Sequence, residues 1–178
     1  MGEIIAEILY VFDFDGTLIN TGKGDEEQKN IYKEKTGNDW GWSSWWDRKE
    51  SLDTNIFTHT PIPDVVGIYN NVIDIPNILV VMLTGRKTNL SEYVEAVLKK
   101  NGLMDFDRYM YNYGGDTLTN KKDQIFDLVN EIDTIRKIVM YDDRDVHIPQ
   151  FNIFCGELIK LGFIDEFNVF HVKDGKIR

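Results

Sequence analysis

Two carboxylates stand one residue apart at Asp13 and Asp15, directly after the apolar run of residues 8–12. A short apolar run predicts a buried strand, and Gly16 permits the chain to turn sharply after it. In open α/β sheets, ligands bind at the carboxyl ends of the strands. One carboxylate placed there can attack a substrate or bind a metal ion while the other moves a proton. The alternative is a strand that merely ends in an acidic turn.

A second acidic pair, Asp142 and Asp143, follows the apolar residues 137–141. If both strands end at one edge of a sheet, the two pairs meet across it and offer the oxygen ligands that Mg²⁺ prefers. The second pair could instead cap the next helix. Consecutive acids after a buried strand seldom serve packing alone. We therefore expect a magnesium site built from Asp13, Asp15, Asp142 and Asp143.

Groups that could hold a phosphoryl group follow the strand predicted over residues 78–83. Thr84 offers a hydroxyl, Gly85 a backbone N–H and Arg86 a guanidinium. The planar fork of a guanidinium matches phosphate oxygens, which favours a substrate-binding role for Arg86. A surface ion pair is the alternative for Arg86, and an ordinary strand-to-helix turn for Thr84.

A lysine at the start of the next helix could offset the negative charge of the carboxylates and of a phosphoryl group. Lys121 and Lys122 both stand at this place. The spacing from Thr117 favours Lys121, and Lys122 remains an alternative. Either side chain could also be ordinary solvated helix surface.

The elements that would position these groups alternate between strands and helices. Apolar runs predict strands over residues 6–12, 78–83, 107–111, 137–141 and 166–172. Amphipathic patterns predict helices that include residues 90–98, 120–133 and 145–161. Continuous apolar strands between such helices predict a three-layer, Rossmann-like α/β fold with a parallel sheet covered on both faces.

Residues 20–76 interrupt this alternation, and we interpret them as an insertion, or small cap, within a single domain over residues 1–178. Short helices are predicted there over residues 26–35 and 63–73. The insertion also holds tryptophans at positions 40, 42, 45 and 46. These could stack on a nucleobase or form a small core, and packing is the interpretation that we favour.

Composition narrows the function classes. The formal net charge of -10 and pI of about 4.7 argue against an extended nucleic-acid surface. The single cysteine, Cys155, allows no disulfide within the chain and suits a reducing compartment. No apolar stretch is long enough to span a membrane. We therefore expect a cytoplasmic protein without membrane partners, while the oligomeric state stays open.

The stretch from Asp13 to Thr17 resembles the first motif of the haloacid dehalogenase (HAD) superfamily, Asp-x-Asp-Gly-Thr. Leu-Thr-Gly-Arg at residues 83–86, together with Asp-Asp-Arg at residues 142–144, is similar to the HAD domain of Swiss Army Knife RNA repair proteins. The same pair of motifs resembles the phosphatase domain of phage polynucleotide kinase. One departure is Asn120, which stands where those relatives carry an aromatic residue and leaves the choice of lysine open.

This resemblance implies a three-layer HAD fold and a magnesium-dependent phosphatase. Asp13 would attack phosphorus and form an aspartyl-phosphate, and Asp15 would act as general acid and base. Magnesium would be held by Asp13, the backbone carbonyl of Asp15 and Asp143, with Asp142 one shell further out. Thr84 and Lys121 would hold phosphoryl oxygens. The substrate would contact Gly85, Arg86 and Arg144.

The expected substrate is a nucleotide or the terminal phosphate of a nucleic acid, a choice that rests on the resemblance and not on composition. A phosphorylated small metabolite is the enzymatic alternative. A binding module that keeps the fold and senses phosphate without catalysis is the other alternative. Loss of the acidic motif residues would favour such a module, and all of them are present.

Overall fold

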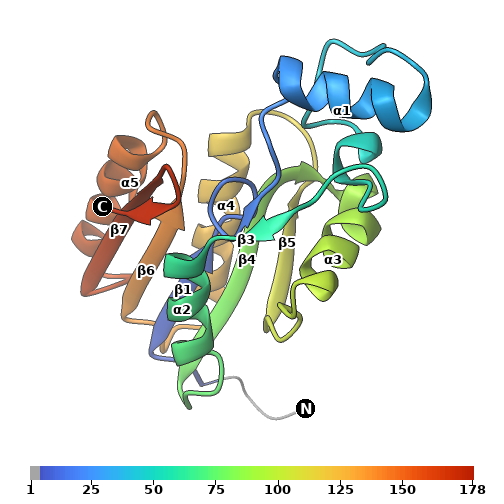
Figure 1. Cartoon of the computed structure of the whole chain (residues 1–178). Helices are drawn as coiled ribbons and strands as arrows, with labels where there is room; N and C mark the ends of the chain where they lie inside the picture. The colour runs from blue at the N-terminus through green and yellow to red at the C-terminus, as the bar shows by residue number, and fades with distance from the viewer. Residues whose placement is uncertain (1–4) are drawn as a thin grey trace.

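The centre of the protein is a six-stranded sheet in the order β5-β4-β1-β6-β7-β8 (Figure 1). The computed structural model describes residues 5–178, so the first four residues of the predicted domain lie outside the description. Five strands are parallel, and β8 pairs with β7 in the antiparallel direction. The strands are β1 (Ile8–Phe12), β4 (Ile78–Lys87), β5 (Arg108–Asn112), β6 (Lys137–Asp142), β7 (Glu166–Lys173) and β8 (Lys176–Ile177).

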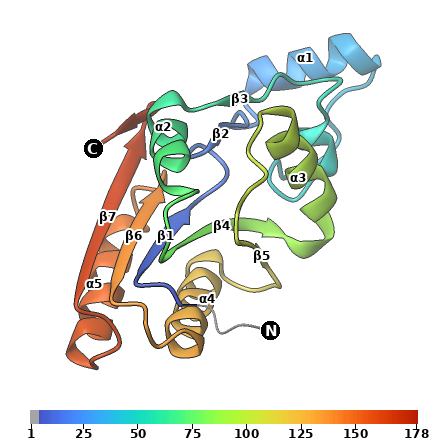
Figure 2. The ribbon, with the colours of Figure 1, turned by 90° about the horizontal axis from the view of Figure 1, so that it is seen from below.

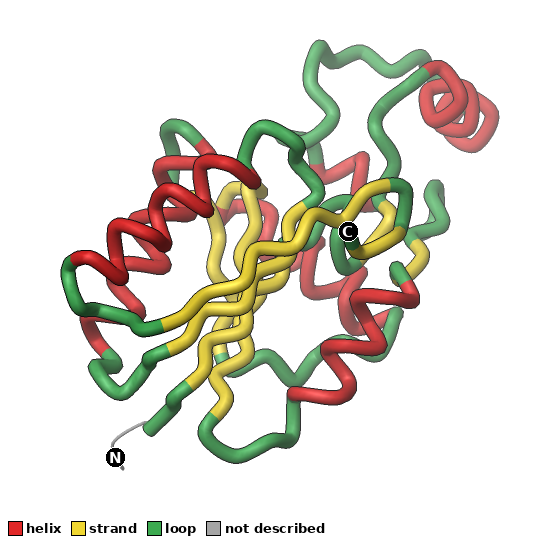
Figure 3. The backbone as a smooth tube through the Cα atoms, turned by 90° about the vertical axis from the view of Figure 1, so that its left-hand side faces the viewer, coloured by secondary structure: helices red, strands yellow, loops and turns green. Residues whose placement is uncertain are grey.

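Helices cover both faces of this sheet, which confirms the predicted three-layer α/β fold (Figures 2 and 3). On one face lie α2 (Pro63–Val72) and α3 (Ser91–Lys100), and on the other lie α4 (Thr117–Glu131) and α5 (Ile148–Lys160). Alternate side chains of β1 supply the two cores: Phe12 packs with α2 and α3, while Leu9 and Val11 pack with α4 and α5.

The position of β1 explains why its carboxyl end can carry a site. β1 lies between β4 and β6, with Val11 level with Val81 on one side and Met140 on the other. The chain runs outward from β1 to β4 and β5, then returns to β6 on the opposite side. Such a reversal opens a crevice at the carboxyl ends of the neighbouring strands. The residues after β1 and at the end of β6 therefore face one another.

The segment between β1 and β4 holds α1 (Glu26–Thr36), the short helix η1 (Lys49–Leu52) and a two-stranded sheet of β2 (Ile19–Asn20) and β3 (Thr60–Pro61). Asp25 caps α1 by accepting from the N–H of Gln28. α1 lies away from the main sheet in Figure 1, whereas α2 joins the core of the sheet. The structure thus places the predicted helix of residues 63–73 in the covering layer.

β4 is longer than the strand predicted over residues 78–83. Its regular pairing with β5 ends at Leu83 and resumes at Lys87, opposite Asn112. Thr84, Gly85 and Arg86 therefore lie within an irregular part of the strand instead of a turn after it. Separately, no helix of the described residues is long and apolar enough to cross a membrane.

Candidate active site

Asp13 lies at the carboxyl end of β1, where its backbone N–H still donates to the carbonyl of Tyr141 in β6. The chain then turns through Gly16, which has a φ of 70°. A Cβ at this glycine would collide with the carboxylate of Asp143. Glycine is therefore required both for its left-handed backbone conformation and for the close approach of the second acidic pair.

Lys121 joins the two acidic pairs. Its Nζ donates to Asp13 Oδ1 at 2.7 Å and to Asp142 Oδ2 at 2.7 Å, and the three side chains are almost fully buried. Burial lowers the pKa of Lys121, but the two carboxylates outweigh it and raise that pKa above its usual value. The ammonium therefore stays charged in the interior, as the predicted role of Lys121 requires. Lys122, the alternative lysine, is half-buried and outside this cluster.

The cluster contains three carboxylates, those of Asp13, Asp142 and Asp143, but one ammonium, that of Lys121. Burial and this excess of negative charge shift the pKa values of the carboxylates. Burial raises the pKa of Asp13 well above its usual value, although Lys121 opposes the shift. Burial, together with Asp142, raises the pKa of Asp143 to about 6. Burial also acts on Asp142, but Lys121 lowers the pKa of that carboxyl below its usual range. The cluster therefore holds more negative charge than the protein itself compensates.

Oxygen atoms of Asp13, Asp142 and Asp143 lie within 4.8 Å of one another, close enough to share a metal ion. Asp142 also accepts from the backbone N–H of Arg144 at 3.0 Å, and His147 Nδ1 lies 3.5 Å from it. With these partners and Lys121, Asp142 is largely occupied. Of the three clustered carboxylates, Asp13 and Asp143 line the pocket and Asp142 does not.

Asp15 points away from this cluster and forms an ion pair with Arg86. Arg86 Nε and Nη2 donate to the carboxylate at distances from 2.9 to 3.2 Å, and the hydroxyl of Thr21 donates to it at 2.7 Å. The other terminal nitrogen, Arg86 Nη1, donates to the carbonyl of Trp46 at 2.7 Å and to Ser51 Oγ at 2.8 Å. Arg86 thus fixes the insertion against Asp15, while its predicted contact with a phosphate stays a prediction.

Thr84 and Gly85 hold the irregular part of β4 near the start of α4. The hydroxyl of Thr84 is fully buried and accepts from the N–H of Arg86 at 3.1 Å. A Cβ on Gly85 would come within 2.7 Å of Thr117 Cγ2. Gly85 and Thr117 both line the pocket, whereas Thr84 is not one of its lining residues. The predicted contact of Thr84 with a phosphoryl oxygen stays a prediction.

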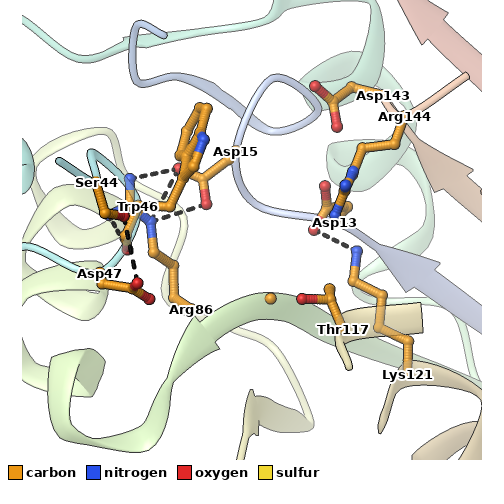
Figure 4. A pocket seen from close by; sticks show the side chains of 11 residues that line it. Asp13, Asp15, Ser44, Trp46, Asp47, Arg86, Thr117, Lys121, Asp143 and Arg144 are labelled. Carbon is orange, nitrogen blue, oxygen red and sulfur yellow. Dashed lines mark hydrogen bonds and ion pairs between the residues drawn. The ribbon is translucent and has the colours of Figure 1, made fainter. Parts of the chain in front are cut away.

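A cavity of about 340 Å³ brings most of these side chains together. Figure 4 shows Asp13, Lys121, Asp143 and Arg144 on one side of it. Residues of the insertion and Arg86 form the opposite side, and Thr117 lies beside Lys121 on the first side. Of the predicted site residues, all but Thr84 and Asp142 line this cavity.

The four tryptophans of the insertion lie in two different places, three in a small core and one at the cavity. Trp40, Trp42 and Trp45 pack with Tyr32 and Phe57 in a small core, which confirms the packing interpretation for three of them. Trp46 is 42% exposed and lines the cavity instead.

Sequence reasoning did not assign four of the lining residues to the site. These are Ser44, Trp46, Asp47 and Thr117. From the sequence, Trp46 was considered only as one of the four tryptophans of the insertion. Thr117 begins a helix whose lysine was predicted to reach the site, so its place at the helix start was a usable signal. Ser44, Trp46 and Asp47 belong to an irregular segment without periodicity, and no signal in the sequence separated Trp46 from its neighbours.

Comparison with known protein families finds a match that covers most of the chain. The profile of the family described as HAD domain family 1 in Swiss Army Knife RNA repair proteins matches residues 28–177. The matched segment contains Lys121, Asp142 and Asp143, whereas Asp13 and Asp15 precede it. No curated protein sequence matches the chain.

Two solved structures resemble the fold. One is the HAD domain of the effector protein Lem4 from Legionella pneumophila, with a TM-score of 0.51 and 16% sequence identity; the match covers 97% of this chain and 88% of that one. The other is a haloacid dehalogenase-like family hydrolase from Streptococcus pneumoniae, with a TM-score of 0.49 and 11% identity, covering 91% of this chain and 93% of that one. At such identities the Lem4 domain supports the fold alone. The match over residues 28–177 shows that the chain belongs to HAD domain family 1 of the Swiss Army Knife RNA repair proteins, a member of the HAD superfamily.

Proposed function

We propose that this HAD-type hydrolase is a magnesium-dependent phosphomonoesterase that works through an aspartyl-phosphate. The proposal rests on the buried ammonium of Lys121, which forms ion pairs with both Asp13 and Asp142 beside the cavity. A buried ammonium between two carboxylates is costly to maintain for stability alone. At the bottom of a polar cavity, the same group can hold a phosphoryl oxygen and offset its charge.

Asp13 is the proposed nucleophile. A carboxylate oxygen of Asp13 would form a bond to phosphorus while the bond from phosphorus to the leaving oxygen breaks. Lys121 restrains the carboxylate at Oδ1 and faces the charge that develops on the phosphoryl oxygens. Arg144 lines the same side of the cavity and supplies a second cation toward the substrate.

Asp15 is the proposed acid and base. It would give its proton to the leaving oxygen in the first step and take a proton from water in the second. In that second step the water oxygen bonds to phosphorus and the bond to Asp13 breaks, so the carboxylate is regenerated. Arg86 and Thr21 hold the carboxylate of Asp15 in one orientation for both steps.

The acidic cluster fits a divalent cation. The oxygens of Asp13, Asp142 and Asp143 lie within 4.8 Å of one another, and burial, together with the neighbouring carboxylates, raises the pKa values of Asp13 and Asp143. Asp13 and Asp143 would hold Mg²⁺, with Asp142 supporting them from its bonds to Lys121 and Arg144. When bound, Mg²⁺ would neutralise phosphoryl oxygens and orient the phosphate for attack.

The proposal is tested by release of inorganic phosphate from a substrate panel, with and without Mg²⁺. The panel holds an aryl phosphate, free 3′ and 5′ nucleotides, short oligonucleotides phosphorylated at either end and phosphorylated metabolites. We expect Mg²⁺-dependent release that Asp13→Asn abolishes, with nucleotides or nucleic-acid ends as the best substrates. A folded protein that binds Mg²⁺ and releases phosphate from none of these would overturn the proposal in favour of a binding module.

A further inference from the structure

Trp46 of the insertion lies where the leaving group of a substrate would emerge from the cavity. We infer that its exposed indole stacks on a flat heteroaromatic ring of that leaving group. The preferred substrate is then a phosphate ester that carries a nucleobase-like ring near the phosphate. This inference rests on the proposed phosphomonoesterase function and names the substrate class of the same site.

Trp46 differs from the neighbouring tryptophans in its surroundings. Trp40, Trp42 and Trp45 make ring contacts within the small core of the insertion, at centroid distances of 4.8 to 6.1 Å. Trp46 takes no part in that cluster and leaves 42% of its surface exposed. A large aromatic side chain gains little stability from such exposure. Its indole therefore offers exposed surface to a ligand in the cavity.

The indole is nevertheless held firmly in place. The carbonyl of Trp46 accepts from Arg86 Nη1 at 2.7 Å, and the guanidinium of Arg86 lies 5.2 Å from the centre of the indole ring. Arg86 is itself fully buried and tied to Asp15 and Ser51. One ring face thus rests on a fixed cation. A ring fixed in this way can stack on a ligand with little further loss of conformational freedom.

The direction of the reaction leads toward this ring. The leaving oxygen lies on the side of phosphorus opposite Asp13 and within reach of Asp15, which would protonate it. Asp15 accepts hydrogen bonds from Arg86, and the indole of Trp46 lies over the guanidinium of Arg86. Figure 4 shows Asp13 and Lys121 across the cavity from Trp46 and Asp15. A leaving group attached to the protonated oxygen therefore passes along the indole.

The rim beside the indole is polar and suited to a nucleoside. Ser44 Oγ donates to Asp47 Oδ2 at 3.3 Å, and both side chains line the cavity with Trp46. A carboxylate there can accept hydrogen bonds from sugar hydroxyls or from exocyclic amino groups. Stacking on an indole tolerates every base, so this arrangement selects for a flat ring and not for one base.

The test compares two substrates in one set of variants. One substrate is the adenosine monophosphate, 3′ or 5′, that the wild type hydrolyses faster, and the other is glycerol 3-phosphate, which has no ring. We expect Trp46→Ala to lower kcat/KM about 10-fold or more for the nucleotide and to leave glycerol 3-phosphate unchanged. Trp46→Phe should restore most of the loss. Tyr113→Ala removes an aromatic that is 70% exposed outside the cavity, and it should change neither substrate.

Two results would overturn the inference. An equal loss for both substrates would mean that Trp46 serves only to hold Arg86 and, through it, Asp15. No loss for either substrate would mean that the indole does not touch the leaving group.

A binding measurement separates this inference from the proposed function. Calorimetric titration of the Asp13→Asn protein with adenosine monophosphate and with ribose 5-phosphate needs no turnover. Tighter binding of adenosine monophosphate that Trp46→Ala removes would support the stacking role even if no substrate were hydrolysed. Equal affinities for the two ligands in an active phosphatase would defeat the stacking role and leave the proposed function intact.

Discussion

Lys121 is the residue on which the charge of the site depends. It is the one cation bonded to both acidic pairs among the described residues, and it is 2% exposed. Breaking a buried ion pair by removing one partner leaves an uncompensated charge in the interior. The neighbouring Lys122 has no such contacts and provides a natural comparison.

We expect Lys121→Met to reduce phosphate release by about 10²-fold or more, because the donor that faces the phosphoryl oxygens is lost. The same change should lower the free energy of unfolding by about 3 kcal/mol, since two buried carboxylates lose their partner. Urea unfolding and a steady-state phosphatase assay measure the two effects. Lys122→Met is the control and should leave phosphate release and the free energy of unfolding near the wild-type values. A loss confined to Lys122→Met would mean that Lys122, and not Lys121, faces the phosphoryl oxygens.

The buried side chain of His59 should make the stability of the fold depend on pH. Its ring is 8% exposed, and neither ring nitrogen has a hydrogen-bond partner among the described residues. Burial, together with the positive charge of Arg86, lowers the pKa of His59 below its usual value. The unfolded chain therefore binds a proton at a higher pH than the folded protein does, and stability falls as the pH drops below about 6.5.

The measurement is the urea midpoint of the wild type and of His59→Gln between pH 8 and pH 5. We expect the wild type to lose stability more steeply across this range than the variant, which carries no titrating group at position 59. Parallel curves would show that His59 is protonated equally in the folded and unfolded states.

The sequence predicted the chemistry of single residues unevenly, for physical reasons. Asp13 and Asp142 end apolar strands, and such strand ends have few structural uses for buried acids, so their place in a common site could be foreseen. The partners of Arg86 could not be foreseen. Besides Asp15, they are Ser51 and Trp46, in a segment that has no helical or strand periodicity and that is folded around its own small core.

At the scale of elements, β4 and α4 approach each other closely at Gly85 and Thr117. Gly85 in the irregular part of β4 lies so close to the first turn of α4 that an added Cβ would come within 2.7 Å of Thr117 Cγ2. Methyl groups at that distance overlap, so one of the two elements must shift. The position of Lys121, one helical turn further along α4, would shift with it.

We expect Gly85→Ala to lower the melting temperature and to slow phosphate release, because the start of α4 is pushed away from β4. Thr117→Ser removes the methyl group in question, so the double variant should recover much of both losses. Gly67→Ala is the matched control: that glycine lies in α2 with open space around it, and alanine there should stabilise the helix by about 0.5–1 kcal/mol. If Thr117→Ser does not restore the melting temperature and the phosphate release of Gly85→Ala, then the overlap with the Thr117 methyl group is not the cause of those losses.

The far end of β4 is a part of the fold that the sequence did not predict. The apolar run ends at residue 83, but pairing with β5 resumes at Lys87, which no hydrophobic pattern marks. Periodicity reports side-chain burial and not backbone pairing, so a polar extension of a strand escapes it. The buried strands β1 and β6 and the amphipathic helices α4 and α5 carry strong periodicity, and they lie where the pattern predicted.

At the scale of the whole molecule, negative charge dominates. The chain has a formal net charge of -10, and Asp13, Asp142 and Asp143 crowd further negative charge into the crevice between β1 and β6. A divalent cation that binds only the folded state adds stability in proportion to the logarithm of its concentration. The whole fold should therefore respond to Mg²⁺, whichever substrate is turned over.

We expect Mg²⁺ at about 100 times its dissociation constant to raise the melting temperature by about 5 to 10 °C. Asp143→Asn should melt higher than the wild type without Mg²⁺, because like-charge repulsion is relieved, and should lose most of the response to the ion. Asp39→Asn removes an exposed carboxylate that pairs with Lys33 in the insertion, and it should respond as the wild type does. A response that survives in Asp143→Asn would place the ion elsewhere.

The most direct test of the central claim is to look for the phosphoryl group on Asp13 itself. The protein is mixed with an aryl phosphate and Mg²⁺, quenched in acid within one turnover, and examined by mass spectrometry of its peptides. The role of Asp13 as nucleophile predicts one added phosphoryl group on the peptide that contains Asp13, its accumulation in Asp15→Asn, which cannot activate water, and its absence in Asp13→Asn. Phosphate release by Asp13→Asn at the wild-type rate, with no phosphorylated peptide in either protein, would contradict it.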